Sequence, residues 1–121
     1  SPEQSNTILK VETLDSFAKE NSLEGISFIK IDVEGHEYSV LVGAEDTLKK
    51  ENAVISLELE MTNYYENCIE SINFLKSCGY SEAHILKNSF SGAISSNFKK
   101  ISIDNFLKLP RKRHKMVLFT K

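Results

Sequence analysis

An apolar run that ends in a cluster of charged residues constrains the fold of this chain more than any other feature. Residues 26–37 read Ile-Ser-Phe-Ile-Lys-Ile-Asp-Val-Glu-Gly-His-Glu. The apolar residues do not alternate cleanly, which is typical of a strand covered on both faces in a parallel sheet between helices. Such sheets bind ligands beyond the carboxyl ends of their strands. We therefore expect the functional site just after this strand, at a turn that Gly35 permits.

The composition is that of an ordinary globular domain. The 121 residues, 40% hydrophobic and 26% charged, have room for one domain with a modest core. A net charge of −2 gives no general attraction to nucleic acid or anionic membranes. No apolar run approaches the roughly 20 residues that span a bilayer, and the polar start is not a signal peptide. We expect a cytoplasmic protein with neither nucleic acid nor membrane as partner. Because the chain lacks an initiator methionine, we expect it to be a segment of something longer.

The two cysteines, Cys68 and Cys78, are expected to be free thiols. Both fall on one predicted helix, where about ten residues at 1.5 Å each separate them by roughly 15 Å, beyond the reach of a disulfide. No cysteine spacing matches a metal site. We therefore expect both to pack as small hydrophobic side chains.

The chain alternates predicted strands and helices. Thr13 caps a helix, helical spacing returns after Glu37, and a third helix runs from about Tyr65 to Cys78, with Gly79 just past its end. Residues 53–59 are a second buried strand, and a strand–helix–strand unit implies that its two strands are parallel. The remaining expected segments are a short strand over 7–12, a strand over 82–86, a long surface loop over 87–100, a short helix or turn over 104–107 and a final antiparallel strand over 115–120.

Four residues near the ends of the two central strands are candidate catalytic residues: Asp32, Glu34, His36 and Glu58. A carboxylate there orients a hydroxyl, takes its proton or holds a divalent ion, whereas the simpler interpretation is an acidic loop before a helix. His36 is either a general base or a solvated loop residue. Glu58 ends an apolar strand, where an unpaired charge is costly, so we expect it to have a partner. Neighbouring strands lie about 4.8 Å apart, which brings Glu58 or Glu60 toward Asp32.

Two other features carry weaker signals. Residues 111–115, Arg-Lys-Arg-His-Lys, are interpreted as a solvated turn before the last strand rather than as a nucleic-acid site. Tyr64 and Tyr65 either line a pocket or pack at a helix start. The sequence has no glycine-rich phosphate loop, nucleophile elbow or zinc signature.

Taken in order, several of these segments resemble the signature of FkbM-type methyltransferases. The similar segments are Thr-Leu-Asp at 13–15, the strand and acidic turn at 28–37, Val-Leu at 40–41, Gly-Ala at 43–44, Leu48 and Ile-Ser-Leu-Glu at 55–58. The resemblance is strong over about residues 13–60 and thin after them, although residues 116–119 are similar to the family's last strand.

This resemblance implies an S-adenosylmethionine-dependent methyltransferase of class I. The fold would be part of an α/β, Rossmann-like three-layer sandwich, with a mainly parallel sheet and a final antiparallel strand. The reaction would pass a methyl group to a hydroxyl of a small molecule or sugar. By position, Asp32 and Glu34 would lie beside cofactor and acceptor, and Glu58 at the end of the next strand. The alternative is a non-catalytic α/β binding or assembly module.

The family's glycine-rich cofactor loop would precede residue 13, so we expect residues 1–121 to be one domain, corresponding to the C-terminal half of the catalytic domain. Asp32 is then the only cofactor-binding residue assigned. Alone, the chain should be inactive and should not bind S-adenosylmethionine, because too few contacts remain. The strand edge carrying Ile29 and Ile31 would be exposed, which invites pairing with another chain. No metal is assigned, although a variant hypothesis has the carboxylates bind Mg²⁺.

Overall fold

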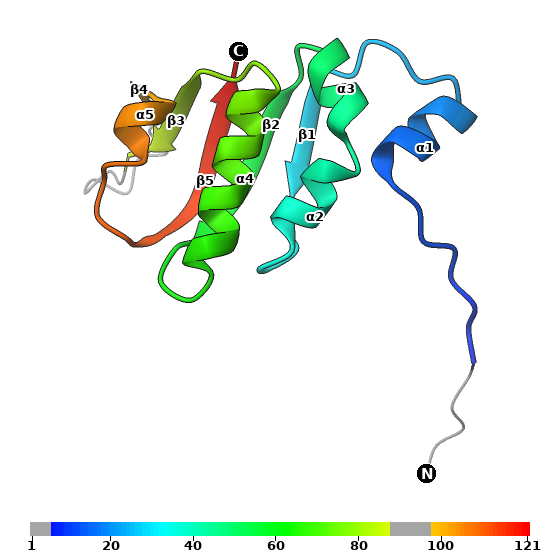
Figure 1. The fold of residues 1–121 in the computed structure, drawn as a ribbon, viewed down its shortest axis with the longest axis horizontal. Helices are drawn as coiled ribbons and strands as arrows, with labels where there is room; N and C mark the ends of the chain where they lie inside the picture. Colours follow the sequence, from blue (N-terminus) through cyan, green and yellow to red (C-terminus); the bar gives the residue numbers. More distant parts are fainter. Residues whose placement is uncertain (1–5, 88–97) are drawn as a thin grey trace.

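A five-stranded sheet, ordered β1-β2-β5-β3-β4, is the framework of the fold (Figure 1). The computed structural model describes residues 6–87 and 98–121. The strands are β1 (Phe28–Ile31), β2 (Val54–Glu60), β3 (Glu82–Leu86), β4 (Phe98–Ser102) and β5 (Arg113–Thr120).

The sheet is mixed rather than mainly parallel. β1 and β2 are parallel, with Phe28 opposite Val54 and Ile31 opposite Leu57, which confirms the predicted strand–helix–strand unit. β5 lies between β2 and β3 and is antiparallel to both, and β4 is antiparallel to β3. β1, β2 and β3 therefore share one direction, as expected. The expectation of mainly parallel pairing is wrong because the final strand inserts between two of them.

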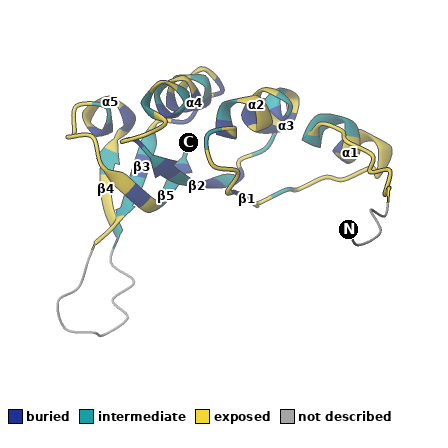
Figure 2. Cartoon of the chain, turned by 90° about the horizontal axis from the view of Figure 1, so that it is seen from below, coloured by how far each residue is buried: buried dark blue, intermediate teal, exposed yellow. Residues whose placement is uncertain are grey.

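Five helices lie on the same side of the sheet (Figure 2). The expected three-layer sandwich is therefore two layers in the part of the chain that the structure describes. The helices are α1 (Leu14–Glu20), α2 (Glu37–Val42), α3 (Glu45–Lys50), α4 (Tyr65–Ser77) and α5 (Ile103–Phe106). Thr13 caps α1 by accepting a hydrogen bond from the amide of Ser16 at 3.1 Å, and Gly79 follows α4 with φ +102°, both as predicted.

The single helix predicted after Glu37 is in fact two, α2 and α3, which break at Gly43 and Ala44. A Cβ on Gly43 would lie 3.0 Å from the side chain of Thr13, so glycine lets the start of α1 approach closely. Asp15 then caps α3: its carboxylate accepts hydrogen bonds from the amides of Asp46 and Thr47, both at 2.9 Å, and from the Thr47 hydroxyl at 2.6 Å. A helix end capped by a distant residue explains why the apolar period alone did not show the break.

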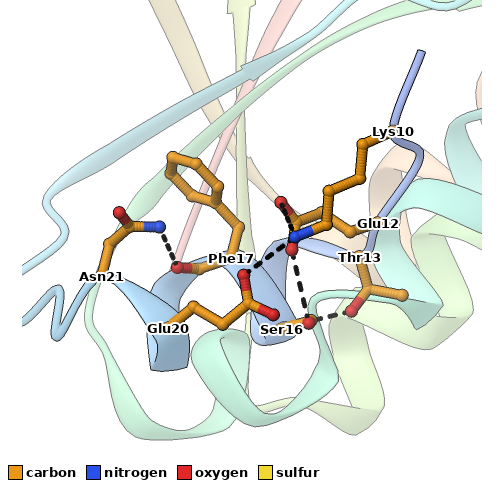
Figure 3. Close-up of polar contacts among 7 residues, drawn as sticks. All are labelled: Lys10, Glu12, Thr13, Ser16, Phe17, Glu20 and Asn21. Atoms are coloured by element: carbon orange, nitrogen blue, oxygen red, sulfur yellow. Dashed lines mark hydrogen bonds and ion pairs between the residues drawn. The ribbon is translucent and has the colours of Figure 1, made fainter. Parts of the chain in front are cut away.

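Exposed polar contacts tie the N-terminal segment to α1 (Figure 3). The ammonium group of Lys10 lies 3.2 Å from a carboxylate oxygen of Glu20 and 3.7 Å from one of Glu12. The Ser16 hydroxyl donates to Glu12 at 3.4 Å. Exposed pairs of this kind typically contribute only about 0–1 kcal/mol to stability.

The core lies between the sheet and α2 to α5. Its fully buried side chains come mainly from β2, β5 and α4, including Leu57, Phe119 and Leu75. The expectation that β1 is covered on both faces is wrong, because the described helices lie on one side of the sheet (Figure 2); Phe28 is 54% exposed. Cys68 and Cys78 are buried and free, as predicted. None of the described helices has the length and apolar character needed to cross a bilayer.

Two other predictions need correction. Residues 7–12 form no strand, and Ile8 and Val11 are 97% and 93% exposed. Their strand-like composition has no neighbouring strand to pair with among the described residues, and an isolated strand is not stable. The expected loop over 87–100 ends in β4 from Phe98 onward, while residues 88–97 lie outside the described part.

Candidate functional site

A pocket of about 240 Å³ lies at the carboxyl ends of β1 and β2. This acidic pocket, as we call it, forms where the sequence predicted a site, because the two parallel strands deliver the residues that follow them to the same edge of the sheet. Its lining residues are Asp32, Glu34, Glu37, Glu58, Glu60, Asn63, Tyr64 and Arg113.

The turn after β1 shapes one side of the acidic pocket. Glu34 and Gly35 have positive φ values, +29° and +84°, and the chain bends at these two residues. The amide of Gly35 donates to a carboxylate oxygen of Glu37 at 3.1 Å, and Glu37 itself is only 3% exposed. A Cβ on Gly35 would lie 2.7 Å from the Tyr64 ring. Glycine is therefore required here both for its φ and for the contact with Tyr64.

An ion pair forms the opposite side. Arg113, at the start of β5, donates from Nε and Nη2 to Oε1 of Glu58, at 3.0 and 2.5 Å. Its Nε also lies 3.9 Å from Glu60. The hydrogen bond and charge of Glu58 raise the pKa of the Arg113 guanidinium. Hydrogen bonds from Thr62, whose hydroxyl and amide both donate, lower the pKa of Glu60. The partner that we expected for Glu58 is thus Arg113.

A β-bulge in β5 stands opposite Glu58. Leu57 pairs with Val117 and Leu59 with His114, so Lys115 and Met116 together face the single residue Glu58. Bulges of this kind redirect side chains and are common beside functional sites. Here the extra residue falls at the rim of the acidic pocket.

The structure brings together three of the four candidate residues, Asp32, Glu34 and Glu58. His36 is not among the lining residues: it is exposed and begins α2 without a capping hydrogen bond from its side chain. Its catalytic role stays a prediction. Within the described ranges, no three His, Cys, Asp or Glu side chains gather closely enough to hold a metal ion.

Sequence reasoning missed Arg113, because it interpreted the basic run as a solvated turn. In the structure, the Arg111 guanidinium lies 3.5 Å from the centre of the Tyr65 ring, and His114 is only 5% exposed. The available signal was the direction of the last strand. An antiparallel strand next to β2 must begin where β2 ends, and this brings the start of β5 to Glu58.

Comparison with known families places this geometry in context. The model of the methyltransferase FkbM domain matches residues 3–82, about two-thirds of the chain. The chain belongs to the FkbM methyltransferase family. No curated protein and no solved structure matches it. The part that matches the FkbM domain includes every residue of the acidic pocket except Arg113, which β5 supplies from outside the matched range.

Proposed function

We propose that this FkbM-family protein is an S-adenosylmethionine-dependent methyltransferase that methylates a hydroxyl of a small molecule or sugar at the acidic pocket. The observation that carries the proposal is the gathering of Asp32, Glu34 and Glu58 around one cavity inside the part that matches the methyltransferase domain. In α/β proteins this edge of the sheet is where ligands bind.

The charge of the acidic pocket fits the proposed cofactor. Five carboxylates line it against one guanidinium, and S-adenosylmethionine carries a positively charged sulfur and an ammonium group. A concave site of one sign attracts groups of the opposite sign. Small-molecule sites usually occupy about 300–1,000 Å³, so a pocket of about 240 Å³ holds only part of a cofactor and an acceptor. Asp32 and Glu34 are the residues that would face the cofactor.

The residues of this chain would then have distinct tasks. When bound, S-adenosylmethionine supplies an activated methyl group. Asp32 is exposed and accepts no hydrogen bond from the other described residues, so its carboxylate is free to take the proton of an acceptor hydroxyl. Glu58 is held by two hydrogen bonds from Arg113, which suits it to orient a ligand. Tyr64 closes one wall, and accurate positioning by such walls supplies much of the rate of a displacement reaction.

The test is methyl transfer by the intact protein that contains this chain. Tritiated S-adenosylmethionine is offered with a panel of sugars and hydroxylated small molecules, and the wild type is compared with Asp32→Asn and Asp32→Ala. Loss of a general base typically lowers the rate by about 10²–10⁴-fold, so both variants should lose transfer while remaining folded. Asp46→Asn removes an exposed carboxylate on α3 and should keep full activity. Near-normal turnover by either Asp32 variant would overturn this role.

A further inference from the structure

A second cavity, of about 220 Å³, adjoins the acidic pocket. Arg113 is a lining residue of both cavities. We call the second cavity the basic pocket, because its described lining residues include three cationic side chains and no carboxylate. Its lining residues are Ile85, Leu86, Lys112, Arg113, His114, Lys115 and Met116.

The start of β5 accounts for this concentration of positive charge. Arg113 and Lys115 are two residues apart in the strand, so the regular alternation of side chains places both on the same face of the sheet. Lys112 immediately precedes the strand. Lys112, Arg113 and Lys115 therefore line one cavity together.

Donors of Arg113 remain for a ligand. A guanidinium has five N–H donors, and Arg113 directs two of them to Glu58. His114 lines the same cavity but is only 5% exposed, and its ring packs against Phe106, so the cationic side chains are the groups that a ligand would meet.

We propose that the acceptor of this methyltransferase is an anionic small molecule, whose phosphate or carboxylate group binds in the basic pocket while its hydroxyl enters the acidic pocket. The inference rests on the proposed function and adds the class of acceptor. The five carboxylates of the acidic pocket repel an anion, whereas Lys112, Arg113 and Lys115 attract it. Opposite charges in adjoining cavities therefore fix which end of the acceptor lies near Asp32.

Binding of simple probes to the 121-residue chain tests this inference without methyl transfer. The probes are inorganic phosphate, acetate, glucose 6-phosphate and glucose, followed through the amide ¹H and ¹⁵N shifts of residues 112–116 at millimolar concentrations. We expect the anions to shift these amides and glucose 6-phosphate to bind about tenfold or more tightly than glucose. The double variant Lys112→Gln/Lys115→Gln should lose this preference. Lys19→Gln/Lys50→Gln, with the same change in charge on α1 and α3, should keep it.

The inference is overturned if phosphate, acetate and glucose 6-phosphate all leave these amides unmoved, if glucose binds as well as its phosphate, or if both double variants behave alike. Binding to phosphatidylglycerol vesicles without binding to soluble phosphates would overturn it in favour of a membrane surface. Intact anion binding in a protein that transfers no methyl group would count against the proposed function alone.

Discussion

Replacing Gly35 by alanine should destabilise the fold and displace a wall of the acidic pocket. Two separate costs are visible in the structure. Gly35 has φ +84°, a left-handed backbone that costs a residue with a Cβ about 1–2 kcal/mol. The added Cβ would also lie 2.7 Å from Cδ1 and Cε1 of Tyr64, and such crowding typically costs about 1–3 kcal/mol. The expected loss of about 2–5 kcal/mol is large against the roughly 5–15 kcal/mol that stabilise most domains.

Gly25 provides a matched control. It has a similar backbone, with φ +68°, but no atom lies within 4 Å of the position that a Cβ would take. Gly25→Ala should therefore cost only the backbone component, about 1–2 kcal/mol. Unfolding in urea, followed by circular dichroism, gives both free energies of unfolding.

A double-mutant cycle isolates the contact with Tyr64. Tyr64→Ala removes the ring, so in Gly35→Ala/Tyr64→Ala only the backbone cost of the first substitution should remain. The two substitutions should thus be non-additive by about 1–3 kcal/mol, with the double variant more stable than the sum predicts. Additive effects, or equal losses for Gly35→Ala and Gly25→Ala, would refute the steric argument.

Three further experiments test other parts of the structure. Burial and the nearby charge of Lys112 lower the folded-state pKa of His114, so the unfolded chain binds a proton first and stability should fall as the pH drops below about 6.5. Below this pH, the urea concentration at the midpoint of unfolding should fall in the wild type, and His114→Phe should lose this dependence on pH. Asp15→Ala should cost about 1–2 kcal/mol and speed hydrogen exchange in α1, because it uncaps α3, whereas an unchanged exchange rate would show that α1 is held elsewhere. Calorimetry should detect no binding of S-adenosylmethionine to the 121-residue chain, and light scattering should give a mass above the monomer because the β1 edge pairs with another chain. Micromolar binding by a monomer would contradict both expectations.

Much of the candidate site was predictable because it depends on short stretches of sequence. The apolar run before Asp32 predicts a strand, and the glycine after Glu34 permits the turn that the structure shows. The helix cap at Thr13 was also predictable from the residues around it. Parallel pairing of β1 with β2 then follows from general rules of handedness, and with it the approach of Glu58 to Asp32.

The covering of the strands was less predictable. The presence of an apolar residue such as Phe28 in the sequence does not show whether another layer of structure packs over its side chain. Its 54% exposure depends on which elements pack nearby. The break between α2 and α3 depends similarly on Asp15, a residue far away in the sequence.

The sequence by itself determined β1, β2, β3, α1 and α4, the cap at Thr13 and the acidic turn, because these depend on neighbours along the chain. Only the tertiary structure decided that β5 inserts between β2 and β3 and carries a bulge opposite Glu58. That placement joins Arg113 to Glu58 across fifty-five residues of sequence and sets a basic pocket beside an acidic one. Strand order is fixed by long-range pairing and by the burial of a shared core, and neither leaves a periodic signal in the residues concerned.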